Sequence, residues 1–161
     1  GADAEEICKA MASFNGVDRR FDFKLKTDRM VFLSDYAHHP AEIKQSVSSI
    51  RTLYPDKKIT AVFQPHLYTR TRDFYKEFAD SLSLLDEVIL LDIYPARELP
   101  IPGVSSQLIY DHLRPGIQKS LCKKEDLMNV LAGKTLEVLI TLGAGDIENY
   151  VPQIYEMLKD K

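Results

Sequence analysis

Residues 59–91 read ITAVFQPHLYTRTRDFYKEFADSLSLLDEVILL, and this stretch decides the fold. Ile59–Phe63 is a short, apolar and partly β-branched run, which predicts a buried strand. Apolar residues then recur at helical spacing over residues 74–85, which predicts a long amphipathic helix. Val88–Leu91 is a second continuously apolar run. A strand, a helix and a strand in this order are typical of a parallel sheet that is covered on both faces.

The same alternation continues on either side of this unit. Further strands are expected at 30–33, 117–121 and 136–142, and further helices at 2–14, 40–53, 108–113, 127–131 and 147–158. Residues 21–25 alternate apolar with polar side chains and, with the turn at Thr27-Asp28, predict a hairpin with the strand at 30–33. We therefore expect a doubly wound, mostly parallel, Rossmann-like α/β sheet with helices on both faces and an N-terminal edge hairpin.

Length and charge exclude several classes of protein. The 161 residues suit one domain spanning residues 1–161, and a hydrophobic content of 45% excludes a disordered chain. The net charge of −3 argues against a nucleic-acid partner. No apolar stretch approaches the roughly 20 residues that span a bilayer, so no membrane partner is expected. Cys8 and Cys122, which form no CxxC pair, are expected to be buried thiols of a cytoplasmic protein.

Four polar loops follow the predicted strands, at the edge where open α/β sheets bind ligands. They read SDYAHHP (34–40), QPHLYTRTR (64–72), DIYPARE (92–98) and GAGD (143–146). Arg70 and Arg72 lie near the start of the predicted helix, where a cation opposes the helix dipole by about 0.3–1 kcal/mol. A bound anion would reverse that penalty, because it would meet free backbone N–H groups and a guanidinium together. Alternatively, Arg72 pairs with Asp73 at the surface.

The other polar groups carry a less specific signal. Asp35, His38 and His39 are of metal-ligand types, but adjacent histidines in one loop seldom face a single ion, so loop packing or substrate contact is favoured. Residues 143–146 resemble half of a dinucleotide fingerprint without its third glycine, which favours a close backbone approach or a tight turn. The sequence contains no phosphate-loop motif and no G-x-S-x-G. These residues therefore indicate an α/β domain that binds a small anion with Arg and His.

The motifs of the chain, taken in order, resemble those of one known family. Besides the loops above, they include RRF (19–21), YPA (94–96) and PIPG (100–103). The chain is similar to the C-terminal domain of the Mur ligases of peptidoglycan synthesis, from its first helix to its last. FQPHLYTRTRDF (63–74) and DYAHHP (35–40) resemble in particular the member that joins L-alanine to UDP-N-acetylmuramate. The resemblance implies the third domain of a three-domain enzyme whose UDP-sugar-binding and central ATPase domains are absent from this chain.

The resemblance also implies a chemistry and a set of site residues. The family uses ATP and Mg2+ to activate the muramate carboxylate as an acyl phosphate, which the amine of L-alanine attacks. His66 and Arg70 would hold the alanine carboxylate, with Tyr36 lining the pocket, and Arg20 and Asp35 would meet ATP across the domain interface. The remaining candidates in the site loops are His38, His39, Arg72, Gly143, Gly145 and Asp146. No metal ligand and no tightly bound cofactor is expected in this domain. The isolated domain is expected to be inactive, because aligning two substrates supplies much of the rate.

Two positions depart from the family pattern. Leu67 stands where many relatives have Arg, so binding of the carboxylate would depend on Arg70 alone. Ser34 stands where relatives often have a second Asp. We therefore expect the first departure to weaken alanine binding, and we assign no consequence to the second.

Two alternative functions stay open. A related ligase attaches a murein tripeptide to the same UDP-sugar and shares the His-His-Pro loop. A stand-alone module that binds an anion or a nucleotide is the second alternative. A purely structural interaction domain would leave the sheet edge rich in His, Arg and Asp unexplained.

Overall fold

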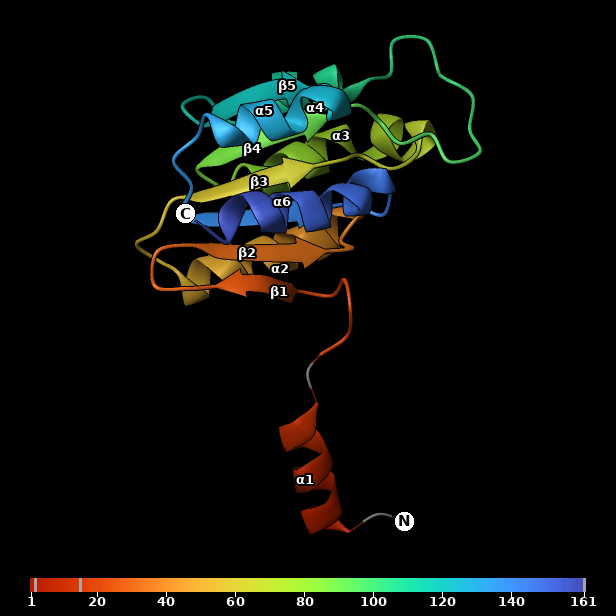
Figure 1. Cartoon of the computed structure of the whole chain (residues 1–161). Coiled ribbons are helices and arrows are strands. Elements are labelled where there is room, and N and C mark those ends of the chain that lie inside the picture. The colour runs from red at the N-terminus through yellow and green to blue at the C-terminus, as the bar shows by residue number, and fades with distance from the viewer. Residues whose placement is uncertain (2, 15, 161) are drawn as a thin grey trace.

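The computed structural model describes residues 1, 3–14 and 16–160. Six strands form one sheet in the order β1-β2-β6-β3-β4-β5. They are β1 (Asp22–Lys26), β2 (Val31–Asp35), β3 (Ile59–Phe63), β4 (Glu87–Leu91), β5 (Gln118–Cys122) and β6 (Val138–Leu142). β1 pairs antiparallel with β2, and the other pairs are parallel (Figure 1). The predicted mostly parallel sheet with an edge hairpin is therefore confirmed.

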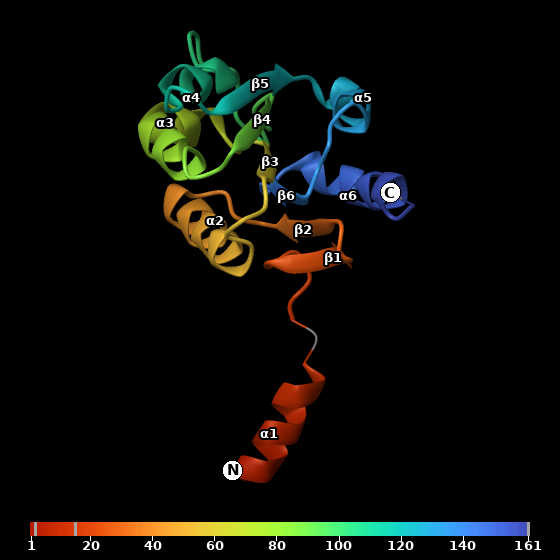
Figure 2. The ribbon, with the colours of Figure 1, turned by 90° about the vertical axis from the view of Figure 1, so that its left-hand side faces the viewer.

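Helices cover both faces of this sheet (Figure 2). One face carries α2 (Pro40–Leu53), α3 (Tyr68–Leu82) and α4 (Ser106–His112), and the other carries α5 (Leu127–Ala132) and α6 (Val151–Leu158). Two short 3-10 turns, η1 (Lys124–Asp126) and η2 (Asp146–Tyr150), precede α5 and α6. Every residue of β2, β3, β4 and β6 is buried. Burial from both faces explains why these strands are continuously apolar rather than alternating.

Helix α3 begins earlier than its apolar periodicity predicts. The apolar stripe starts at Phe74, whereas the helix starts at Tyr68 and is kinked at Phe74, where φ is −127° and ψ is 15°. The first turns are polar and carry Arg70, so they contribute little to a hydrophobic pattern. The kink separates this polar start from the part of α3 that packs on the sheet.

The carboxyl ends of β2, β6 and β3 form the switch point of the fold. β3 and β6 are neighbours, but α3 leaves to one face and α6 to the other. A crevice opens where the chain leaves neighbouring strands in opposite directions. Backbone hydrogen bonds join the loops here: the Gly143 N–H donates to the Asp35 carbonyl at 3.2 Å, and the Gln64 N–H donates to the Leu142 carbonyl at 3.0 Å. Three of the four predicted polar loops therefore start at the same place.

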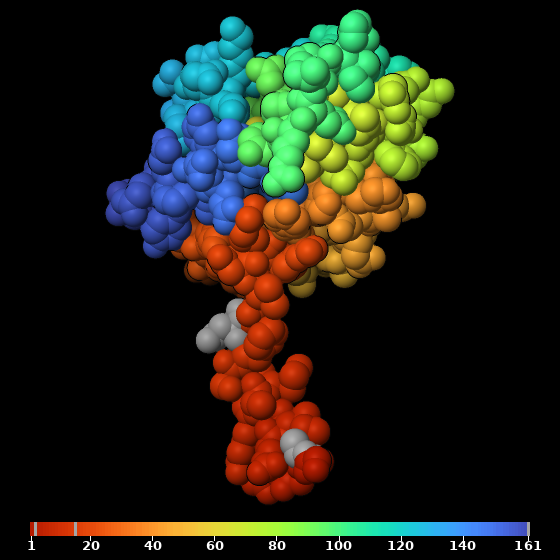
Figure 3. Space-filling model, turned by 90° about the vertical axis from the view of Figure 1, so that its right-hand side faces the viewer, coloured from red at the N-terminus to blue at the C-terminus, as the bar shows by residue number. Residues whose placement is uncertain are grey.

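Helix α1 (Ala4–Ser13) stands away from the sheet (Figures 1 and 3). A capping box starts it: the Glu6 N–H donates to Asp3 Oδ1 at 2.8 Å, and the Asp3 N–H donates to Glu6 Oε2 at 3.2 Å. The predicted helix is confirmed, although its expected end at Asn15 lies outside the described residues. None of its residues is buried.

The position of α1 corrects one expectation about burial. Cys122 is buried as predicted, but Cys8 lies on α1 and is exposed. The prediction was wrong for Cys8 because a thiol on a helix that does not pack on the sheet stays in contact with solvent. No helix among the described residues combines the length and the apolar character needed to cross a bilayer.

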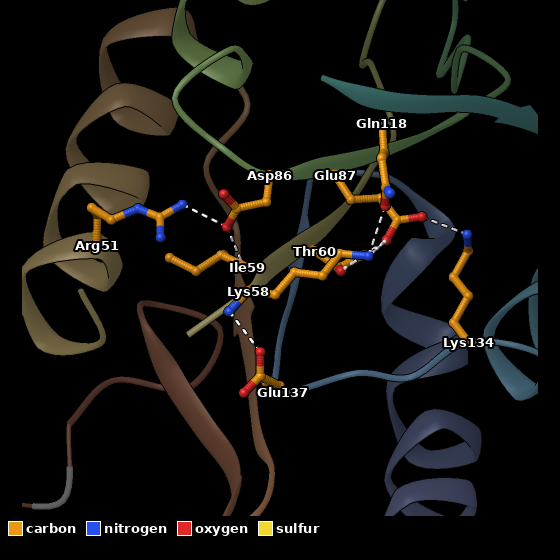
Figure 4. Close-up of polar contacts among 9 residues, drawn as sticks. All are labelled: Arg51, Lys58, Ile59, Thr60, Asp86, Glu87, Gln118, Lys134 and Glu137. Atoms are coloured by element: carbon orange, nitrogen blue, oxygen red, sulfur yellow. Dashed lines mark hydrogen bonds and ion pairs between the residues drawn. The ribbon is translucent and has the colours of Figure 1, made fainter. Parts of the chain in front are cut away.

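At the amino edge of the sheet, far from the switch point, two lysines hold a buried carboxylate (Figure 4). Glu87 starts β4 and is 4% exposed. Its carboxylate lies 2.5 Å from Lys134 Nζ and 2.7 Å from Lys58 Nζ. Burial raises the pKa of Glu87, but hydrogen bonds with Lys134 and Lys58 outweigh this effect and hold the pKa below its ordinary value. Glu87 therefore stays ionised and ties β4 to the segments before β3 and β6.

We expect Glu87→Gln to lower the free energy of unfolding by roughly 2 kcal/mol at pH 7. A depressed folded-state pKa means that the carboxylate contributes fully above the ordinary pKa of Glu and loses its contribution as pH falls through the folded value. The difference between wild type and variant in urea unfolding should therefore shrink from about pH 5 to about pH 3. The control Glu125→Gln, at an exposed position, should change the free energy of unfolding at pH 7 by less than about 0.5 kcal/mol. A Glu87→Gln difference that stays constant over this range would contradict the assignment.

Candidate functional site

Aromatic and basic side chains from four segments meet at the carboxyl edge of the sheet. The rings of Tyr36 and His38 lie with their centroids 5.1 Å apart, and those of His38 and His66 lie 6.0 Å apart. The rings of His66 and Tyr94 are stacked at 5.6 Å. The guanidinium carbon of Arg19 lies 4.5 Å from the centre of the Tyr36 ring. The fold thus joins the loop before β1 with the loops after β2, β3 and β4.

The backbone fixes His66 at the end of β3. His66 and Tyr94 form an isolated parallel β-bridge. The Leu67 N–H donates to the Tyr94 carbonyl at 2.9 Å, and the Tyr94 N–H donates to the Pro65 carbonyl at 2.8 Å. This pairing continues the β3–β4 ladder past both strands and holds Leu67 at a φ of +74°. A left-handed φ at a non-glycine residue costs on the order of 1 kcal/mol, so the surrounding hydrogen bonds hold this turn in place.

Arg70 and His66 form the pair that was predicted to bind a carboxylate. Arg70 Nη1 lies 3.4 Å from His66 Nδ1. A guanidinium can only donate, so Nδ1 must be the unprotonated nitrogen, and the proton sits on Nε2. Burial lowers the pKa of His66, and the positive charges of Arg70 and His38 lower it further, against a smaller opposing effect of Glu98. The imidazole is therefore neutral at pH 7 and presents one N–H donor beside a fixed positive charge.

The start of α3 differs from the expectation of free N–H groups. The Thr69 N–H donates to Glu98 Oε2 at 3.0 Å, and the Thr69 hydroxyl donates to Glu98 Oε1. The anion at the helix start is thus a carboxylate of the chain itself. An incoming carboxylate is left with the guanidinium of Arg70 and the Nε2–H of His66.

Arg20 and Asp35, the predicted ATP contacts, line one hollow of about 340 Å³ beside Tyr36. The Arg20 guanidinium carbon lies 5.3 Å from the centre of the Tyr36 ring. Asp35 is 7% exposed, and its carboxylate accepts hydrogen bonds from the Ala37 N–H at 3.1 Å and the Ser46 hydroxyl at 2.5 Å. The two predicted residues therefore share a wall of the same hollow, and the carboxylate is held in one orientation.

The structure separates two other candidates from this cluster. The His39 ring lies 5.1 Å from the ring of Phe74, whereas the His38 ring lies beside Tyr36 and His66. Arg72 is paired with the adjacent Asp73 at 2.7 Å on the surface. The adjacent histidines thus face different surroundings, and the alternative of a surface ion pair holds for Arg72.

Gly143, Gly145 and Asp146 pack against a buried amide. Gln64 is fully buried, and its Nε2 donates to Asp146 Oδ1 at 2.6 Å. A Cβ on Gly143 would lie 2.8 Å from the backbone oxygen of Gln64, and a Cβ on Gly145 would lie 2.4 Å from its Oε1. Burial raises the pKa of Asp146, but Lys124 and Gln64 hold it below its ordinary value. The expected close backbone approach is therefore present. The loop after β6 packs against Gln64, which directly precedes the segment that carries His66.

Sequence reasoning missed the roles of Gln64, Tyr94 and Glu98. Each lies in one of the four polar loops, so its position in the chain was a usable signal. The contacts that define these roles join residues from different loops and leave no local spacing pattern. No group of three or more His, Cys, Asp or Glu side chains that could hold a metal ion occurs within residues 1, 3–14 and 16–160.

Comparison with known proteins identifies relatives of this chain. The chain is 76% identical over 161 residues to a UDP-N-acetylmuramate–L-alanine ligase of Phocaeicola vulgatus, covering 100% of the chain and 35% of that relative. The crystal structure of a UDP-N-acetylmuramate–alanine ligase of Thermotoga maritima has a TM-score of 0.79 at 26% identity, covering 99% of the chain and 34% of that structure. A murein peptide ligase of Psychrobacter arcticus shares the fold, with a TM-score of 0.72 at 17% identity over 100% of the chain and 34% of that structure. The chain spans about a third of the length of the relatives it matches.

A family profile gives the same assignment over most of the chain. The profile described as "Mur ligase, glutamate ligase domain" matches residues 19–145. This range contains all strands and helices from β1 to β6 and the cluster around His66. The chain therefore belongs to the Mur ligase family and contains the C-terminal domain of such a ligase.

Proposed function

We propose that this chain is the amino-acid-binding domain of a cytoplasmic, ATP-dependent ligase that joins L-alanine to UDP-N-acetylmuramate. The observation that carries the proposal is the Arg70–His66 pair at the switch point, 3.4 Å apart. The 76% identity to a relative named for this activity supports the choice of alanine and UDP-N-acetylmuramate as substrates.

The pair fits the carboxylate of an amino acid. Arg70 offers a planar fork of donors, and His66 Nε2–H offers one more donor without a charge. A neutral His66 adds direction, whereas Arg70 supplies the attraction between opposite charges. Tyr36, whose ring lies 5.1 Å from that of His38, lines the same side of the cluster. This arrangement would hold the carboxylate and leave the amine free to face the activated muramate.

The hollow beside Tyr36 fits one part of ATP. Asp35 offers a carboxylate that can accept from a ribose hydroxyl, and Arg20 offers a cation for a phosphate. When bound, ATP supplies the phosphoryl group that activates the muramate carboxylate. We place the magnesium ligands and the UDP-sugar site in the rest of the ligase.

The test compares the full-length ligase with the 161-residue chain. The full-length enzyme, given ATP, Mg2+ and UDP-N-acetylmuramate, should release ADP when L-alanine is added. The isolated chain should release none, because it cannot align the amine with the activated carboxylate. Release of ADP by the isolated chain would overturn the assignment of this domain as one part of the catalyst. A full-length enzyme that responds to a murein tripeptide and not to alanine would be the recycling ligase instead.

A further inference from the structure

Helix α3 starts without a capping side chain of its own. The residue at its N-cap position is Leu67, which has no hydrogen-bond acceptor in its side chain and makes no capping bond. The first N–H groups of a helix have no partner within the helix and need one from elsewhere. Glu98, 29 residues further along the chain than Thr69, accepts from the Thr69 N–H at 3.0 Å and from the Thr69 hydroxyl. A carboxylate at this position also complements the helix dipole.

Glu98 belongs to the long loop that joins β4 to α4. This loop extends beyond the carboxyl ends of the strands and crosses the face on which the site lies (Figures 1 and 3, green). The residues on either side of Glu98 are largely exposed to solvent, and the side chain of Leu99 is 84% exposed. The backbone of Ala96, two residues earlier, has a φ of +52°. Among the described residues 95–104, only the side chain of Glu98 accepts hydrogen bonds from α3. The carboxylate thus fastens the middle of the loop to the first turn of the helix.

The same turn carries the guanidinium of the proposed pocket. Arg70 follows Thr69 directly, and its Nη1 reaches back to His66 Nδ1 at 3.4 Å. The Thr71 hydroxyl donates to the Leu67 carbonyl at 2.9 Å, so the turn is tied on its other side as well. The negative charge of Glu98 raises the pKa of His66, while burial, Arg70 and His38 lower it. Glu98 is therefore coupled to both members of the pair: to Arg70 through the backbone of the first helical turn, and to His66 through its negative charge.

We propose that Glu98 is a positioning residue for the amino-acid pocket: it caps α3 from a remote loop and thereby directs Arg70 towards His66. The proposal rests on the function proposed above, because it assigns the pocket to the carboxylate of L-alanine. It also limits how that carboxylate is recognised. Since Glu98 occupies the Thr69 N–H at the start of α3, we assign the substrate carboxylate to the side chains of the Arg70–His66 pair.

Steady-state kinetics of the full-length ligase tests this role. Glu98→Ala should raise the KM for L-alanine about 10-fold, with the KM values for ATP and UDP-N-acetylmuramate within about 2-fold of wild type. Glu98→Gln keeps an acceptor for the Thr69 N–H and should recover most of the loss. The control Glu77→Gln removes the same charge from an exposed position further along α3 and should change none of the three KM values. An unchanged KM for alanine in Glu98→Ala, or an equal fall in activity towards all three substrates, would overturn the proposal.

A second measurement does not depend on turnover. In the 161-residue chain, NMR titration of the His66 ring should give a lower pKa in both Glu98 variants than in wild type, because a nearby negative charge has been removed. The Thr69 amide resonance should move strongly in Glu98→Ala and less in Glu98→Gln. If His66 and Thr69 are unaffected in both variants, the coupling is refuted. A full-length enzyme that does not use alanine would instead refute the proposed function, while these resonances would still report whether Glu98 caps α3.

Discussion

Replacing Arg70 by Ala in the full-length ligase should raise the KM for L-alanine about 100-fold. The guanidinium is the charged member of the Arg70–His66 pair, and hydrogen bonds to charged groups contribute roughly 1.5–3 kcal/mol each. Without Arg70 one cause of the lowered pKa of His66 is gone, but burial, the largest cause, still lowers it, so His66 does not supply the lost charge at pH 7. The Thr69 N–H at the start of α3 cannot replace it either, because it already donates to the carboxylate of Glu98. The effect should therefore fall on the amino acid, with the KM for ATP close to wild type.

Two further variants show what Arg70 contributes. Arg70→Lys keeps a positive charge without the planar fork and should recover part of the loss. Lys76→Ala removes a cation from an exposed position on the same helix and should leave the KM for alanine unchanged. A KM for alanine that stays at the wild-type value in Arg70→Ala would refute the assignment of the carboxylate site.

Gly143→Ala should lower the free energy of unfolding by roughly 3 kcal/mol. Two costs combine at this residue. Its φ of +143° lies in a region that side-chain-bearing residues rarely adopt, and the added Cβ would lie 2.8 Å from the backbone oxygen of Gln64. That oxygen cannot move easily, because the Gln64 N–H is tied to the Leu142 carbonyl at 3.0 Å and the side chain is fully buried. The clash therefore strains the backbone at the switch point.

Urea unfolding of the 161-residue chain would measure this cost against two matched glycines. Gly103 has a φ of +78° but open space around the position of its Cβ, so Gly103→Ala should show the backbone cost alone, about 1 kcal/mol. Gly133 has a φ of −78° and no neighbour of its Cβ nearer than 3.8 Å, so Gly133→Ala should be neutral or slightly stabilising. If Gly143→Ala loses no more stability than Gly103→Ala, the backbone at Gln64 can shift to accept the added Cβ, and the predicted strain is absent.

Most of the fold could be predicted because buried elements have a recognisable pattern of apolar residues along the chain. The runs at 59–63 and 88–91 are apolar throughout, since both faces of β3 and β4 are covered, and they match the observed strands to within a residue. This apolar pattern is absent where part of an element is not buried, so the element cannot be located from it. The polar first turns of α3 show no periodicity, so the predicted helix began six residues too late, at Phe74 instead of Tyr68.

The candidate site could be predicted in part, for a related reason. Strands of a parallel sheet end at one edge, so the loops at 34–40, 64–72 and 143–146 were expected at that edge, and the observed strand order brings them close together. That argument places loops and not side chains. It could not show that His38 and His39 diverge, with one ring 6.0 Å from His66 and the other 5.1 Å from Phe74.

The spacing of apolar residues was enough to establish the layers of this protein, its edge hairpin and the edge of the sheet that carries polar loops, because each depends on neighbours close in the chain. The assembled molecule alone revealed that Glu98 caps α3, that Arg70 turns to His66, and that the apolar side of α1 is left uncovered by the described residues. Those outcomes depend on where separate loops meet in space and on the few ångströms between their atoms. A pattern of residue types along one segment holds no information about such distances.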